Sequence, residues 1–154
     1  MKVFISYGSG PDQVTALRLQ ALAAVNGLTV YVPPAYTRQP SFVLPETETE
    51  QKLKDADIVL GIVGAELSET CRQELFAGRK LKKPTIVMTG FVAAPHLEPY
   101  FGSDLVIIDP ANPAQTEFEI VRHLKQRNAS QQATKALIAL GTLALGLLIF
   151  APQD

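Results

Sequence analysis

Five short apolar runs, each separated from the next by a more polar and helix-like stretch, set the pattern of this chain. They are rich in valine and isoleucine, and most of them do not alternate apolar with polar positions. Continuous apolar strands of this kind are typical of a parallel sheet that is covered on both faces. The runs cover residues 3–7, 28–32, 58–63, 85–88 and 105–108. The pattern therefore predicts five β-strands joined by helical crossovers.

This alternation predicts an α/β domain with a flavodoxin-like fold: a doubly wound five-stranded parallel sheet of strand order 2-1-3-4-5. Ligands of such sheets bind at the carboxyl ends of the strands, near the reversal of order between strands 1 and 3. The segments that reach this edge are 7–12 and 64–68, and the loop 33–44 opens beside them. We therefore expect the functional site there.

Helix signals fill the gaps between the strands. The first helix begins near Ser9 and Pro11, and its core-facing stripe is predicted to be Val14, Leu17, Ala21 and Val25. The second begins near Pro45, the third runs from about Ser68 to Lys82, and the last runs from Pro113 to about Arg127. Between residues 90 and 103, two prolines argue against a long regular helix.

The C-terminal end of the chain carries the most apolar segment. Residues 136–151 hold no charge, and a polar stretch, 128–132, precedes them. At about 1.5 Å per residue the segment spans roughly 24 Å, against about 30 Å of hydrocarbon in a bilayer. Basic side chains dominate its N-terminal flank, as in cytoplasmic flanks of membrane spans. We expect a globular domain at 1–127, a linker at 128–132 and a membrane anchor helix at 133–151, with the N-terminal domain cytoplasmic. The alternative is an apolar helix that packs on the domain or on other copies of itself.

Composition narrows the function classes. The chain has 154 residues and a formal net charge of −1, which suits one domain and argues against nucleic acid as a partner. Its single cysteine excludes an intramolecular disulfide and a multi-cysteine zinc site. We expect neither a metal nor a bound cofactor.

Glu74 is the strongest candidate for chemistry. On a helical wheel it falls within the apolar arc of the third helix, among Cys71 and Leu75, and not on the charged side. A carboxylate on a buried face is costly unless it is paired or used, and burial raises its pKa. The alternative is a structural glutamate that bonds to a neighbouring loop or a lysine. Cys71 itself is expected to be a packed small hydrophobe.

Two loops at the expected edge supply binding candidates. The turn 7–12 brings glycines and a helix N-terminus to the edge, which favours anions, although an ordinary tight turn explains it equally well. The proline-rich loop that begins at Pro33 either covers a pocket or is an ordinary long loop. The candidate substrate-binding residues are Ser6, Tyr7, Gly8, Ser9, Tyr36, Arg38 and Ser68.

Several segments together resemble a Toll/interleukin-1 receptor (TIR) domain. They are KVFISY at 2–7, GLTVY at 27–31, ADIVL at 56–60 and SETCRQEL at 68–75, and the resemblance covers about residues 1–127. It implies cleavage of NAD⁺, as substrate and not as cofactor, at the nicotinamide–ribose bond. It also implies Glu74 as the catalytic residue, self-association or contacts with other TIR domains, and a role in defence or signalling.

Two other interpretations remain open. Thr70 stands where family members often carry tryptophan, and the signature after the second strand is reduced to residues 38–40, which favours a non-enzymatic adaptor acting through TIR–TIR contacts. The helix from Ser68 and the following strand also resemble nucleoside 2-deoxyribosyltransferases, whose catalytic glutamate lies similarly. That resemblance implies base exchange on deoxynucleosides and indifference to NAD⁺.

Overall fold

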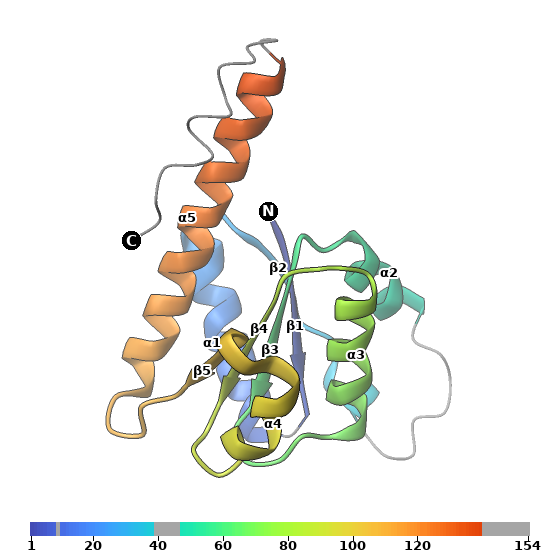
Figure 1. Ribbon diagram of the computed structural model, residues 1–154, viewed down its shortest axis with the longest axis vertical. Coiled ribbons are helices and arrows are strands. Elements are labelled where there is room, and N and C mark those ends of the chain that lie inside the picture. Colours follow the sequence, from blue (N-terminus) through green and yellow to red (C-terminus); the bar gives the residue numbers. More distant parts are fainter. Residues whose placement is uncertain (9, 39–46, 140–154) are drawn as a thin grey trace.

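The structure is a computed structural model that describes residues 1–8, 10–38 and 47–139. These residues form one sheet of five parallel strands (Figure 1). Their order is β2-β1-β3-β4-β5, as the pattern of apolar runs predicts. The strands are β1 (Lys2–Tyr7), β2 (Thr29–Tyr31), β3 (Ile58–Val63), β4 (Thr85–Thr89) and β5 (Leu105–Ile107). All six residues of β3 are buried, because this strand lies in the middle of the sheet with helices on both faces. The predicted flavodoxin-like α/β fold is confirmed.

The helices cover the sheet in two layers (Figure 1). One layer consists of α1 (Gly10–Val25) and α5 (Pro113–Ala139), which share a core with the strands that includes Leu19, Leu60 and Leu124. The other layer consists of α2 (Thr47–Asp55), α3 (Glu69–Lys80) and α4 (Ala94–Phe101). Two short 3₁₀ helices, η1 (Ala35–Arg38) and η2 (Gly102–Asp104), complete the described elements.

Close contact between α3 and β3 depends on two glycines. A Cβ on Gly61 would lie 2.8 Å from Leu75 Cδ2, and one on Gly78 would lie 2.8 Å from Val59 Cγ2. Distances below about 3 Å are far inside van der Waals contact, so neither position accepts a side chain without a shift of its neighbours. The sequence thereby determines how near α3, and with it Glu74, comes to the sheet.

The orientation predicted for α1 is wrong. Its buried residues are Asp12, Ala16, Leu19 and Ala23, whereas Val14, Leu17 and Val25 of the predicted stripe are 54%, 48% and 87% exposed. The helix is apolar over most of its circumference, so hydrophobic periodicity does not define which face turns inward. Alanines make up half of the buried face, because small side chains allow a helix to lie closer to the sheet.

The segment between β4 and β5 forms a short helix despite its prolines. Pro95 occupies the first turn of α4, where no backbone N–H is required, and Pro99 lies inside the helix. Because Pro99 has no backbone N–H, α4, which has eight residues, lacks one backbone hydrogen bond at this position. Leu97 and Phe101 turn inward and join the core beneath α3 and α4.

The C-terminal helix is longer than predicted. α5 runs without interruption through 128–132, the predicted linker, and is helical up to Ala139, the last described residue. Among the described residues, no helix is long and apolar enough to cross a membrane. This finding contradicts the predicted single-pass membrane location with an anchor at 133–151, of which residues 140–151 lie outside the described part of the chain.

Candidate functional site

Glu74 lies on the inner side of α3, against the first strand. Ser68 caps the helix by accepting a hydrogen bond from Cys71 N at 3.2 Å, and Leu75 packs on Gly61 of β3. Because Ser6 of β1 pairs with Gly61 in the sheet, it faces the same part of α3. The Ser6 hydroxyl donates a hydrogen bond of 2.8 Å to Glu74 Oε1. This hydrogen bond therefore offsets part of the free-energy cost of burying the Glu74 carboxylate.

Arg38 encloses the carboxylate from the other side. It is the last residue of η1, in the loop that follows β2, and its Nη2 and Nη1 donate to Glu74 Oε1 and Oε2 at 2.6 and 3.1 Å. The side chains of Arg38 and Glu74 are only 6% and 11% exposed. Two parallel charge-assisted hydrogen bonds in such an enclosed place are strong and fix the orientation of the carboxylate.

Tyr7 packs against Arg38. The guanidinium carbon of Arg38 lies 4.7 Å from the centre of the Tyr7 ring, a cation–π contact. The Tyr7 hydroxyl donates a hydrogen bond of 2.6 Å to Pro33 O, which ties the start of the loop to the end of β1. Among the described residues, Arg38 Nε has no hydrogen-bond partner although it is buried. The Nε–H of the guanidinium is therefore a buried donor without a partner in the described part of the chain.

Burial dominates the electrostatics of the cluster. It raises the pKa of Glu74 above its ordinary value, although Arg38 and the Ser6 hydroxyl act in the opposite direction. Burial also raises the pKa of Tyr7, partly offset by Arg38, and raises the pKa of the Cys71 thiol to about 12. Cys71 is buried, as predicted for a packed small residue.

The structure brings most of the predicted site residues to one place. Ser6, Tyr7, Arg38 and Glu74 form one connected group, which we call the Glu74 cluster. Gly8 and Ser68 lie against each other beside it, since a Cβ on Gly8 would be 2.6 Å from Ser68 Oγ. Tyr36 lies in η1 and is 52% exposed. Ser9, the remaining candidate, and residues 39–44 of the predicted loop lie outside the described residues.

The pairing of Glu74 with a loop arginine bears on the two interpretations of its buried position. The geometry agrees with the structural alternative, in which a neighbouring loop satisfies the carboxylate. It leaves the catalytic role as a prediction, because a paired carboxylate still carries reactive lone pairs. Both roles are compatible with one arrangement.

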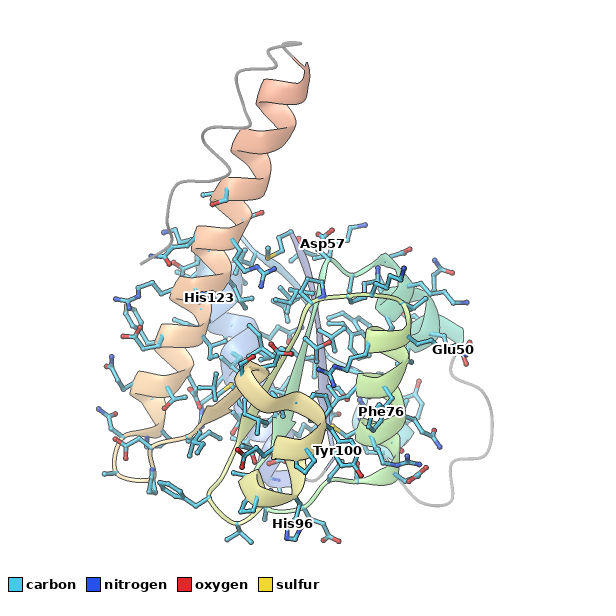
Figure 2. All side chains as sticks on the ribbon, in the orientation of Figure 1. Glu50, Asp57, Phe76, His96, Tyr100 and His123 are labelled. Carbon is cyan, nitrogen blue, oxygen red and sulfur yellow. The ribbon has the colours of Figure 1, made fainter. Side chains whose placement is uncertain are left out.

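Sequence reasoning missed two features of this edge. Asp12, expected only to favour the start of α1, is buried and accepts a hydrogen bond of 3.1 Å from Gly64 N, which ties the loop after β3 to α1. An apolar cavity of about 390 Å³ lies between the loops that follow β3 and β4, lined in part by Leu67, Val92 and His96. His96 is labelled at this edge in Figure 2. Glu74 does not line this cavity, and no sequence signal marked it.

Among the side chains that the structure describes, no group of three or more histidine, cysteine, aspartate or glutamate residues is placed to hold a metal ion. The chemistry that the Glu74 cluster itself offers is that of a carboxylate, two hydroxyls and a guanidinium.

Comparison with known proteins gives a distant structural likeness. No family model matches the chain, and no curated protein matches it. A solved structure of a 2-deoxyribosyltransferase from the psychrotolerant bacterium Bacillus psychrosaccharolyticus aligns with a TM-score of 0.46 and 21% identity. The alignment covers 58% of this chain and 72% of that one. A likeness this distant carries no information about activity.

The predicted membership of the TIR family is wrong. The solved neighbour is a 2-deoxyribosyltransferase and not a TIR domain, and no family model supports the assignment. The roles that rested on that resemblance, namely NAD⁺ cleavage, TIR–TIR contacts and defence signalling, lose their basis with it. What remains is the geometry of the Glu74 cluster.

Proposed function

We propose that this protein is an enzyme that exchanges the base of a 2′-deoxynucleoside by way of Glu74. The observation that carries the proposal is a carboxylate whose side chain is 11% exposed, held in one orientation by a hydroxyl and a guanidinium. A fixed and poorly solvated carboxylate suits attack on a sugar carbon that develops oxocarbenium character. This agrees with the resemblance of the third helix to nucleoside 2-deoxyribosyltransferases.

The two carboxylate oxygens have different roles in this proposal. Oε1 accepts two short hydrogen bonds, from Ser6 and Arg38, whereas Oε2 accepts one of 3.1 Å from Arg38. A substrate that contacts Oε2 therefore displaces fewer hydrogen bonds than one that contacts Oε1. To expose Oε2, Arg38 Nη1 must give up its contact, while the hydrogen bonds to Oε1 keep the carboxylate in place.

The reaction proceeds in two displacements. Glu74 Oε2 forms a bond to C1′ while the C1′–N bond breaks, and the electron pair of that bond leaves with the base, which takes up a proton from solvent. A nitrogen of a second base then attacks C1′, loses its own proton to solvent, and releases the carboxylate. The charges balance over the cycle, and the two inversions retain the configuration at C1′.

The same hydrogen bonds favour deoxyribose over ribose. When Oε2 attacks C1′, Oε1 already accepts from Ser6 and Arg38 and has little capacity left for a 2′-hydroxyl. A ribonucleoside would then bury an unsatisfied hydroxyl, which costs about 1 to 3 kcal/mol. We expect a preference for 2′-deoxynucleosides.

The experiment is a base-exchange assay on the full chain. Incubation with 2′-deoxyinosine and adenine should yield 2′-deoxyadenosine and hypoxanthine, separated by liquid chromatography. The Glu74→Gln variant should show no exchange, while Glu117→Gln, which removes a different buried carboxyl, should retain it. Hypoxanthine release without deoxyadenosine would mean that water is the acceptor and would make the protein a hydrolase. Absence of both products, or nicotinamide release from NAD⁺ instead, would refute the proposal.

A further inference from the structure

A second cavity, of about 710 Å³, opens at the opposite edge of the sheet from the Glu74 cluster. Its walls are the beginnings of β4 and β5, the C-terminal end of α3, η2, and the part of α5 around His123, which Figure 2 labels. This volume lies within the range of about 300 to 1,000 Å³ that is usual for small-molecule sites. None of the residues of the Glu74 cluster lines it.

The cavity is positively charged although the chain is not. Its lining includes four basic and two acidic side chains, against a formal net charge of −1 for the whole chain. The charged lining residues are Arg79, Lys82, Lys83, Arg127, Asp104 and Glu119. A local excess of two positive charges in a concave site favours an anionic ligand.

Both carboxylates of the cavity already have partners. Asp104 pairs with Arg79 at 3.4 Å, and Glu119 pairs with Arg122 on the surface of α5. Lys83 is also committed, because its Nζ donates to the backbone oxygens of Lys54 and Ala56, each at 2.6 Å. The pairing of Asp104 and Glu119 with arginines means that neither carboxylate neutralises the remaining cations of the cavity.

Lys82 and Arg127 are the two cations that remain. Neither forms a salt bridge with another side chain in the described part of the chain. Lys82 has a φ of 58°, at the position just beyond α3 where glycine is the usual residue. This conformation is that of a helix end, closed by hydrogen bonds from Lys82 N to Arg79 O and from Lys83 N to Gly78 O.

The floor of the cavity is apolar. Ile86 of β4, Val106 of β5 and Ile120 of α5 line it, and Ile120 is 4% exposed. We propose that this cavity binds a small phosphate ester, whose phosphate contacts Lys82 and Arg127 and whose apolar or aromatic body lies on this floor. A phosphate suits the pair better than a carboxylate, because it offers three oxygens to an arginine fork and a lysine together.

The test is calorimetric titration of the full chain with ADP as the probe. ADP should bind saturably, and Lys82→Gln and Arg127→Gln should each weaken the binding about tenfold, as expected for loss of one charged contact. Glutamine keeps much of the side chain and removes its charge. Lys80→Gln, at the end of α3 but outside the cavity, is the matched control and should bind as the wild type does.

Two further ligands test the phosphate contact and the apolar contact separately. Adenosine, which lacks the phosphates, and pyrophosphate, which lacks the apolar body, should each bind at least about tenfold more weakly than ADP. Equal binding of either ligand would overturn the corresponding contact. No saturable binding of ADP, or equal binding by Lys80→Gln and by the two cavity variants, would overturn the whole inference. Because the Glu74 cluster is itself proposed to bind nucleosides, only the binding that Lys82→Gln and Arg127→Gln weaken is assigned to this cavity. The comparison of these variants does not depend on whether base exchange occurs.

Discussion

In two arginine–glutamate pairs of this protein the guanidinium binds both carboxylate oxygens, but the two arginines have different surroundings. Arg38–Glu74 and Arg18–Glu117 both join residues that are far apart in the chain, by 36 and 99 positions. Both arginines donate to both oxygens of their glutamate. The arginine of the second pair is 53% exposed, however, whereas Arg38 is 6% exposed.

The side chains of Glu117 and Glu74 are 9% and 11% exposed, so the two pairs differ in the surroundings of the arginine and not in those of the carboxylate. Arg18–Glu117 joins α1 to α5 at a place where water screens the arginine, and its effect is to raise the pKa of Arg18. In Arg38–Glu74 both partners are shielded from water, so burial raises the pKa of Glu74 despite the adjacent cation. The first pair connects two helices, and the second fixes the orientation of a carboxylate for which we propose a catalytic role.

The largest expected effect separates the two glutamates by activity. Glu74→Gln should lower the rate of base exchange by about a thousandfold or more, because an amide cannot act as the nucleophile. Glu117→Gln should change the rate by less than about threefold. Exchange rates measured beside circular dichroism spectra check both variants. Similar losses in two folded variants would remove the distinction between the pairs.

A double-mutant cycle compares stability within the enclosed pair. Arg38→Gln and Glu74→Gln should each lower the free energy of unfolding by about 1 to 3 kcal/mol, since each leaves the other charge buried alone. The double variant should recover most of this loss. Denaturant unfolding monitored by circular dichroism gives the coupling energy. Additive losses would show that the two side chains act independently.

The pH dependence of the exchange rate should reveal the raised pKa. The rate should fall as the pH is lowered through the pKa of Glu74, with a midpoint above the ordinary value of 4.5. Arg38→Gln should move this midpoint upward, because it removes the cation that favours the charged form. A midpoint at or below 4.5 would mean that the site is more polar than the structure indicates.

The same shift has a consequence for stability. A folded pKa above the unfolded one means that the contribution of Glu74 to stability is fully present below the unfolded pKa. That contribution is lost as the pH rises through the folded pKa. Unfolding experiments across this window should show the loss in the wild type and not in Glu74→Gln.

The smallest expected effect concerns the pair whose arginine is exposed, Arg18–Glu117. Arg18→Gln should lower the free energy of unfolding by less than about 1 kcal/mol, and the loss should shrink further in about 0.5 M salt. Thermal unfolding at low and high salt measures it. A loss as large as that of Arg38→Gln, or one that salt does not reduce, would show that exposure is a poor guide to the strength of these pairs.

The sheet was predictable because its strands carry one clear signal. Ile58–Val63 is a continuous apolar run, which is typical of a strand buried on both faces. The orientation of α1 was not predictable, because apolar residues surround most of that helix and its buried face includes the charged Asp12. The polar residues 128–132 continue α5, since alanine and glutamine favour a helix as readily as a linker.

Only part of the candidate site was predictable. The helical wheel places Glu74 on the buried face, and turn signals bring Tyr7 and Arg38 to the same edge. The contact between Arg38 and Glu74 was not predictable, because it depends on the path of the loop after β2 and on the close approach that Gly61 allows. The TIR resemblance failed because short strand and helix motifs, such as KVFISY, recur in α/β folds of different function.

The reactivity of Cys71 toward a thiol reagent provides a measure of how often α3 separates from the sheet. Its side chain is 1% exposed, its Sγ lies 3.3 Å from Ser6 Oγ, and its pKa of about 12 keeps it protonated at neutral pH. It is also the only cysteine of the chain, so a thiol-alkylating reagent modifies a single site. Labelling can proceed only in molecules where the helix has separated from β1. The labelling rate therefore measures how often α3 separates from β1 and exposes Glu74, and no engineered cysteine is needed.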